Sequence, residues 1–225
     1  MENREWEEHY PPIDSHPAVR ALPYRFPIPH SRFPAPMPYS NIDDYPADVL
    51  ARAAKVRLAC FDVDGTLTDG RLLFDSEGRE IKAFHVHDGQ GLSLLKRSGI
   101  AVAFVTARIS PIAELRAREL GVDACTNVGD KLACVRGIAD RMGIGMEAVS
   151  FMGDDFVDLA AMQAVGLSAA PGDAHAWVRE RVHWRTVARA GEGAAREFCD
   201  LLLVAQGKAH ALLAQVLVPA GLGLQ

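Results

Sequence analysis

The chain has 225 residues, 49% of them hydrophobic, enough for one domain with an extension or for two small domains. Its formal net charge is −5 at pH 7, which gives no strong positive field for nucleic acid or an anionic membrane. The four cysteines are scattered without a Cys-x-x-Cys pair, so we expect no zinc site. The amino terminus has no apolar signal-peptide core, and no apolar run is long enough to span a bilayer. These features favour a cytoplasmic enzyme with no nucleic-acid or membrane partner.

Prolines are concentrated near the amino terminus, where residues 11–46 hold ten of the thirteen. Such close spacing is incompatible with a helix or a central strand. We therefore expect residues 1–46 to be a proline-rich, poorly ordered extension outside the catalytic core. The interleaved aromatic residues leave open a docking role on some surface. The domain itself is expected over residues 47–208, with residues 209–225 as a carboxyl-terminal tail.

The rest of the chain alternates short apolar runs with segments of helical composition. Strands are predicted over residues 56–61, 100–106, 122–126, 148–152 and 166–170. Helices are predicted over residues 46–54, 88–98, 110–121, 130–142, 155–165, 174–181 and 194–206. A β-hairpin is predicted over residues 71–84. Alternating strands and helices indicate an α/β fold, with a parallel sheet and helices on both of its faces.

Two aspartates, Asp62 and Asp64, stand at the carboxyl end of the first predicted strand. In open parallel sheets this is the edge where ligands bind, and residues two apart in an extended chain share one side. Two carboxylates held so close repel each other unless a cation or a shared proton relieves them. Mg²⁺ suits such a pair because it takes one or two carboxylates and keeps positions for water and phosphate. The spacing therefore favours a magnesium site.

Other polar residues recur at predicted strand ends, namely Thr106, Lys131 and Asp154. Each residue type suits phosphoryl transfer, in which one carboxylate attacks phosphorus, a second moves protons, and cations neutralise charge. Taken singly, each has a more ordinary interpretation. Thr106 could merely end a strand, Lys131 could be a solvated helix residue, and Asp154 could be a helix cap. Their common placement at strand ends makes coincidence improbable.

The order Asp-x-Asp, Thr, Lys, Gly-Asp-Asp-x-x-Asp resembles the four motifs of the haloacid dehalogenase-like phosphatases. Residues 61–70, 82–89, 149–155 and 193–202 narrow the resemblance to the 3-deoxy-D-manno-octulosonate (KDO) 8-phosphate phosphatases. It covers roughly residues 47–208. The implied fold is a Rossmann-like (HAD-like) parallel sheet with a short β-hairpin flap. No separate cap domain is expected, because the intervals between the motifs have no room for one.

The resemblance implies a role for each of five residues. Asp62 would be the nucleophile and a ligand of Mg²⁺. Asp64 would be the general acid and base and would bind the metal through its backbone carbonyl. Asp154 would be the remaining protein ligand, and Thr106 and Lys131 would bind phosphate.

The resemblance also implies a set of residues that approach the substrate: His85, Val86, His87, Asp88, Gly89, Ser93, Arg108 and Arg116. The two arginines suit a carboxylate chemically, because a guanidinium can bind it bidentately. His85 and His87 have an equally good interpretation as solvated hairpin residues.

The implied activity is hydrolysis of a small sugar phosphate, KDO 8-phosphate, to KDO and phosphate during lipopolysaccharide biosynthesis. A phosphatase of a nine-carbon, sialic-acid-type sugar acid phosphate is an alternative. A non-catalytic regulatory domain of the same fold is another, although a binding module needs no nucleophile.

The resemblance further implies a homotetramer. The hairpin over residues 71–84 and the stretch after Gly207 carry more apolar surface than free segments should expose. We expect the hairpins to pair between subunits and the carboxyl-terminal segment to reach a neighbour's site. The alternative is that both stretches fold back on their own core.

Deletion of residues 1–44 should leave turnover and thermal stability largely unchanged, because all the motifs lie downstream and proline-rich segments rarely join a packed core. The truncated and intact proteins would be compared by thermal denaturation and by phosphate release. A large loss of either quantity would show that the extension packs on the core.

Overall fold

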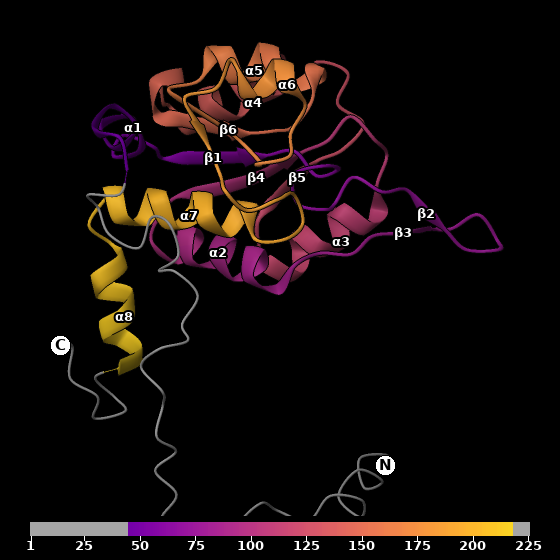
Figure 1. Ribbon diagram of the computed structural model, residues 1–225, viewed down its shortest axis with the longest axis horizontal. Coiled ribbons are helices and arrows are strands. Elements are labelled where there is room, and N and C mark those ends of the chain that lie inside the picture. The colour runs from indigo at the N-terminus through magenta and orange to yellow at the C-terminus, as the bar shows by residue number, and fades with distance from the viewer. Residues whose placement is uncertain (1–44, 218–225) are drawn as a thin grey trace, which may run out of the picture. The chain divides into compact units, whose positions relative to one another are not determined.

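The computed structural model describes residues 45–217, and within them a six-stranded sheet forms the centre of the fold (Figure 1). Its strands are β1 (Leu58–Phe61), β4 (Ala101–Val105), β5 (Asp123–Cys125), β6 (Val149–Met152), β7 (Leu167–Ala170) and β8 (Trp184–Arg185). They lie in the order β5-β4-β1-β6-β7-β8, and all pairs are parallel. The predicted parallel sheet is confirmed. The chain leaves β1 toward one side of the sheet and later returns to the other, so the carboxyl end of β1 lies where the strand order reverses.

Helices cover both faces of this sheet (Figure 1). One layer contains α1 (Ala47–Ala53), α2 (Val86–Arg97), α3 (Pro111–Leu120) and α7 (Ala194–Ala205). The other contains α4 (Lys131–Met142), α5 (Leu159–Ala164) and α6 (Ala176–Arg179). Two short 3₁₀ helices, η3 (Met146–Ala148) and η4 (Phe156–Asp158), flank β6.

Successive side chains of a strand point to opposite faces of the sheet, so each strand contributes to both layers. Leu58 and Cys60 of β1 belong to the core beneath α4, α5 and α6, whereas Ala59 and Phe61 belong to the core beneath α2 and α7. All four side chains are buried, which explains why β1 reads as a continuous apolar run rather than an alternating one. The strand is therefore fixed from both sides, and with it the residues that follow.

Helix ends match the signals in the sequence. The Ser110 hydroxyl accepts the Ala113 N–H at 3.3 Å at the start of α3, and the Asp130 carboxylate accepts the Ala133 N–H at 3.0 Å at the start of α4. Gly121 and Gly143 end these helices in the left-handed conformation. The start of α4 is important because its first residue, Lys131, is one of the predicted site residues.

The hairpin consists of β2 (Leu73–Phe74) and β3 (Glu80–Ile81), which pair with each other and with no other strand of the described residues. Its apolar side chains Leu72, Leu73, Phe74 and Ile81 are each about half exposed, from 47% to 57%. Within residues 45–217 no cap domain interrupts the sheet, so the predicted fold class is confirmed with its short flap.

Several element bounds differ from the prediction. Helix α2 begins at Val86, two residues earlier than expected, and the first turn of the predicted helix 155–165 is the 3₁₀ helix η4. The short strand β8 and the helix α8 (Ala209–Leu217) were not predicted. Leu212 of α8 packs against the main core, and the Arg97 guanidinium donates to the Gln215 side chain at 3.2 Å. Most of the predicted amino-terminal extension, residues 1–44, lies outside the described residues.

In the part of the chain that the structure describes, no helix is long and apolar enough to cross a membrane.

An aromatic cluster ties α7 to the sheet. The Phe198 ring lies 5.9 Å from that of Phe61 on β1 and 6.2 Å from that of Trp184 on β8, measured between centroids. Trp184 also contacts Tyr45 at 6.0 Å. Phe198 is fully buried. Because it contacts both rings, it packs α7 against the central strand β1 and the edge strand β8.

Phe198→Ala should lower the free energy of unfolding by about 3–5 kcal/mol, because it leaves a cavity between β1 and β8. Leu213→Ala on α8 is the control, since Leu213 is 56% exposed and its truncation should change stability by no more than about 0.5 kcal/mol. Urea denaturation of both variants would measure the difference. An equal loss of unfolding free energy in the two variants would contradict the packing of Phe198 between β1 and β8.

Candidate active site

The residues predicted at the strand ends converge on the carboxyl edge of the sheet. Asp62 follows β1, Thr106 follows β4 and Asp154 comes two residues after β6, while Lys131 begins α4. β1 lies between β4 and β6, so these positions are adjacent. The Asp62 N–H extends the ladder by donating to the Met152 carbonyl at 2.9 Å.

A buried ammonium lies at the centre of the group. Lys131 Nζ donates to Asp62 Oδ1 and to Asp158 Oδ1, each at 2.6 Å. Burial by itself would lower the pKa of Lys131, but the charges of the two carboxylates outweigh it, so this pKa lies above its usual value. The lysine is therefore a fixed positive charge facing the end of β1.

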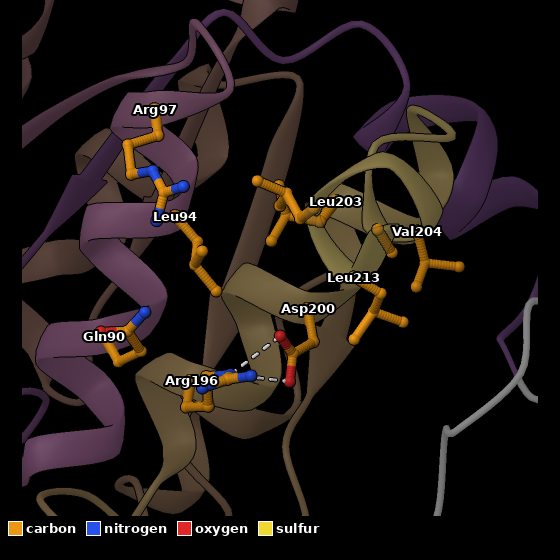
Figure 2. Close-up of a pocket in the computed structure, with 10 residues that line it drawn as sticks. Gln90, Leu94, Arg97, Arg196, Asp200, Leu203, Val204 and Leu213 are labelled. Carbon is orange, nitrogen blue, oxygen red and sulfur yellow. Dashed lines mark hydrogen bonds and ion pairs between the residues drawn. The ribbon is translucent and has the colours of Figure 1, made fainter. Parts of the chain in front are cut away.

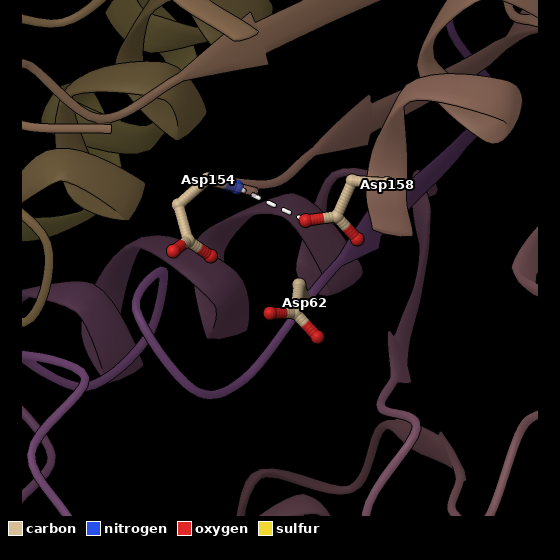
Figure 3. A group of neighbouring side chains, drawn as sticks. All are labelled: Asp62, Asp154 and Asp158. Atoms are coloured by element: carbon tan, nitrogen blue, oxygen red, sulfur yellow. Dashed lines mark hydrogen bonds between the residues drawn. The ribbon is translucent and has the colours of Figure 1, made fainter. Parts of the chain in front are cut away.

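Asp158 orders the loop that carries Asp154. Its second oxygen accepts the backbone N–H groups of Asp154 at 3.1 Å and Asp155 at 3.2 Å, and the first of these is drawn in Figure 3. Asp158 and Asp155 together form a capping box at the start of η4. Asp158 is completely buried, and its contacts position both Lys131 and the Asp154 backbone. Asp158 is the last aspartate of the Gly-Asp-Asp-x-x-Asp motif, but it was not among the predicted site residues.

Three carboxylates meet beside this lysine, and oxygen atoms of Asp62, Asp154 and Asp158 lie within 4.8 Å of one another (Figure 3). Burial and the neighbouring carboxylates raise the pKa of Asp62 to about 7 and that of Asp154 to about 8. The single ammonium thus leaves negative charge uncompensated. A divalent cation with a preference for oxygen ligands would relieve it, so the residues fit Mg²⁺.

The loop after β1 is shaped to approach Asp154. Gly65 has φ of +89°, and a Cβ atom there would lie 2.2 Å from Asp154 Oδ2. The neighbouring Thr66 hydroxyl donates to Asp154 Oδ1 at 3.2 Å. A residue with a side chain at position 65 would therefore displace the Asp154 carboxylate.

A second charged group surrounds Asp64. The Lys82 ammonium, from just after β3, donates to Asp64 Oδ1 and at 3.1 Å to Glu80 Oε1. Arg108 Nη2 donates to the same Glu80 oxygen at 2.9 Å, and its Nε lies 3.7 Å from Asp64 Oδ2. Burial would raise the pKa of Glu80, but hydrogen bonds and charge from Lys82 and Arg108 hold it below its usual value. The sequence placed Asp64 and Arg108 in the site but gave no role to Glu80 or Lys82.

A third group lies between α2 and α3. His85, Asp88, Gly89 and Arg116 line one small cavity with Phe84. The guanidinium of Arg116 lies 5.7 Å from the centre of the Phe84 ring, and a Cβ at Gly89 would meet Arg116 Nη2 at 2.1 Å. The glycine thus leaves room for the arginine.

The remaining residues predicted to approach the substrate are less closely grouped. Val86 and His87 are exposed on the first turn of α2, and Ser93 is half-buried about two turns along it. Asp88, which also lines the small cavity beside Arg116, is buried, and its Oδ1 accepts the Arg196 N–H of α7 at 2.7 Å. Burial raises the pKa of Asp88. Asp88 therefore caps the first turn of a neighbouring helix, a contact that local sequence does not reveal.

A larger cavity of about 350 Å³ lies elsewhere, between α2, α7 and α8 (Figure 2). Its walls are mostly aliphatic, with Arg196 and Asp200 paired at 2.9 Å on one side. None of the predicted site residues lines it.

Comparison with known proteins gives a consistent picture. No protein-family model matches the chain. The KDO 8-phosphate phosphatase KdsC of Escherichia coli K12 is 41% identical over 163 residues, which are 72% of this chain and 87% of KdsC. The crystal structure of a hypothetical protein from Xanthomonas campestris is 54% identical, with a TM-score of 0.77 over 80% of this chain and 98% of that one. The Moraxella catarrhalis KDO 8-phosphate phosphatase, in complex with magnesium, phosphate and KDO, is 36% identical, with a TM-score of 0.74 over 76% of this chain and 99% of that one.

The fold and the strand-end carboxylates define a hydrolase of the haloacid dehalogenase-like superfamily. Within that superfamily, the chain belongs to the KDO 8-phosphate phosphatase (KdsC) family.

Gly65→Ala should weaken Mg²⁺ binding at least tenfold, because its Cβ displaces the Asp154 carboxylate. Gly78→Ala is the matched control, since Gly78 has φ of +77° but no atom of the described part of the chain lies within 4 Å of an added Cβ. Both variants carry the cost of a left-handed alanine, and only the first carries the collision. Titration calorimetry with Mg²⁺ would measure the affinities, and equal affinities would contradict the proximity of Gly65 to the metal site.

Proposed function

We propose that this chain is a cytoplasmic, Mg²⁺-dependent phosphatase that hydrolyses KDO 8-phosphate to KDO and phosphate. The observation that carries the proposal is the set of converging carboxylates and one buried ammonium at the carboxyl edge of the sheet. Carboxylates that can attack phosphorus and move protons, and a fixed ammonium that can neutralise charge, are groups that phosphoryl transfer uses, which supports the proposal. Membership of the KdsC family selects the sugar acid phosphate among the possible substrates.

In this proposal Asp62 is the nucleophile and Asp64 the general acid and base. An oxygen–phosphorus bond forms at Asp62 while the bond from phosphorus to the sugar oxygen breaks, and that oxygen takes a proton from Asp64. Water then attacks the aspartyl-phosphate with Asp64 accepting its proton, and this step releases phosphate and restores Asp62. Lys131 places positive charge beside the transferring group, and Thr106 offers its hydroxyl.

Asp62, Asp154 and the backbone carbonyl of Asp64 would hold Mg²⁺. When bound, the ion neutralises charge on the phosphoryl group and fixes its orientation. Asp158 would not need to be a direct ligand, because one of its oxygens accepts Lys131 and the other accepts two backbone N–H groups. Its role would be to hold the Asp154 loop.

The sugar acid would extend from the phosphate toward Arg108 and Arg116. Arg108 is 41% exposed at its side chain, so its guanidinium is accessible to a ligand carboxylate. His85 and Gly89 lie beside Arg116, and Val86, His87 and Ser93 lie along α2. Asp88 would act on this group indirectly, through the packing of α2 against α7.

The assembly we propose is a homotetramer in which the hairpins pair between subunits. The half-exposed Leu72, Leu73, Phe74 and Ile81 support it, because an isolated hairpin with so much exposed apolar surface is unfavourable in water. Leu212 of α8 packs on its own core, which favours the alternative that the start of the carboxyl-terminal segment folds back. The catalytic domain would span residues 47–208, with the proline-rich segment before it and the tail after it.

A panel of sugar phosphates, assayed for phosphate release with Mg²⁺ and with EDTA, tests this function. KDO 8-phosphate should give the highest kcat/KM, and EDTA should abolish turnover. If a nine-carbon sugar acid phosphate gave the highest kcat/KM, that compound would replace KDO 8-phosphate as the assigned substrate. Absence of turnover on the whole panel would favour a non-catalytic domain.

Asp62→Asn should reduce turnover below detection while the fold is retained, because an amide is a poor nucleophile. Circular dichroism and phosphate release measured on the same sample would check both parts. Asp155→Asn is a control, because Asp155 is an exposed cap of η4 and should lose at most a few-fold in activity. Substantial turnover by Asp62→Asn would refute the nucleophile assignment.

A further inference from the structure

The hairpin does more than present an apolar surface, because its second strand leads directly into the charged group around Asp64. Glu80 lies on β3 and Lys82 follows it by two residues, so both side chains are on the same side of the strand. Lys82 contacts Asp64 across eighteen residues of sequence. The Lys82 ammonium therefore links the hairpin to the loop after β1 that carries Asp64.

This contact is shielded from water. The side chain of Lys82 is 1% exposed, that of Glu80 14% and that of Asp64 17%. A pair so enclosed keeps its geometry better than an exposed ion pair, whose energy is largely screened. The Lys82 ammonium is held by two carboxylates at once, which restricts the directions it can point.

The other oxygen of Asp64 is held differently. Among residues 45–217, no group forms a hydrogen bond with the buried Asp64 Oδ2 or with the buried Arg108 Nε, which lies 3.7 Å from it. One side of the carboxylate is thus fixed by Lys82, while the other is left available next to the guanidinium. A buried oxygen of this kind is costly unless a further group completes it. Here Oδ2, carrying the proton of the general acid, would donate it to the leaving oxygen of a phosphate ester, which has no hydrogen of its own.

We propose that Lys82 is a positioning residue for the reaction, which orients the Asp64 carboxylate so that Oδ2 faces the leaving group. Glu80 assists by holding both Lys82 and Arg108. The inference rests on the proposed function, because it gives Lys82 its role through the general acid Asp64. The competing interpretation is that Lys82 only anchors the hairpin and has no effect on the chemical step.

Leaving-group dependence separates the two interpretations. Departure of a sugar alcohol needs a proton from the general acid, whereas the p-nitrophenolate ion leaves readily without one. General acid catalysis contributes about 10²–10⁴-fold, so a disordered acid should cost a sizeable part of that on the sugar phosphate alone. We therefore expect Lys82→Met to lower kcat at least about tenfold on KDO 8-phosphate and less than about threefold on p-nitrophenyl phosphate. An anchoring role would lower both values by the same factor.

A double-mutant cycle with Asp64→Asn provides the second criterion. If Lys82 acts through Asp64, adding Lys82→Met to Asp64→Asn should cause no further loss on the sugar phosphate. Arg79→Ala is the matched control on the same hairpin, since Arg79 is exposed and pairs only with Asp75 and Glu77 among the described residues. It should leave both substrates within twofold of the wild type.

Each outcome decides the matter. A selective loss together with non-additivity supports the proposal, whereas equal losses on both substrates or full additivity overturn it. If Lys82→Met does not fold, Glu80→Ala serves instead, and it should show the same selective loss of kcat with a raised KM. Absence of turnover on both substrates in the wild type would overturn the proposed function itself.

Discussion

The site depends on one buried ammonium that two carboxylates share. Lys131 is fixed at the first turn of α4 and donates to Asp62 and Asp158 over equal distances of 2.6 Å. A buried lysine without partners would be strongly disfavoured, and so would either carboxylate without the lysine. The three groups are therefore mutually necessary. They tie the end of β1, the start of α4 and the loop after β6 into one unit.

Asp154 adds a third carboxylate to this arrangement, so two negative charges remain uncompensated by the single Lys131 ammonium when all three carboxylates are ionised. Asp154 is brought close to Asp62 by a loop that only glycine allows at position 65 and by a hydrogen bond from Thr66. Burial and mutual repulsion then raise the pKa values of Asp62 and Asp154. Perturbed pKa values of this kind are concentrated at functional sites, where burial and like charges are brought together. A bound divalent cation would relieve this repulsion between the carboxylates.

Much of the fold and part of the candidate site could be predicted from the sequence. Parallel strands with buried faces read as apolar runs, and their carboxyl ends share an edge, so Asp62, Thr106 and Asp154 could be grouped without coordinates. Lys82 and Glu80 could not, because their importance comes from a contact between a hairpin and a distant loop. The contact that Asp88 makes could not be predicted either, because its side chain caps α7, which lies far along the chain. Strand β8 was not predicted, because two residues are too few to show the alternation of side chains that indicates a strand.

The most direct test is the thermal denaturation of Asp154→Asn and wild-type protein, each with and without Mg²⁺. The amide keeps the oxygen that accepts Thr66 but removes one of the repelling charges. Without metal, the variant should unfold at a higher temperature than the wild type, and Mg²⁺ should raise the midpoint of the wild type alone. A metal-free variant less stable than the wild type, or one that responds equally to Mg²⁺, would contradict the claim that this carboxylate cluster is organised around a cation.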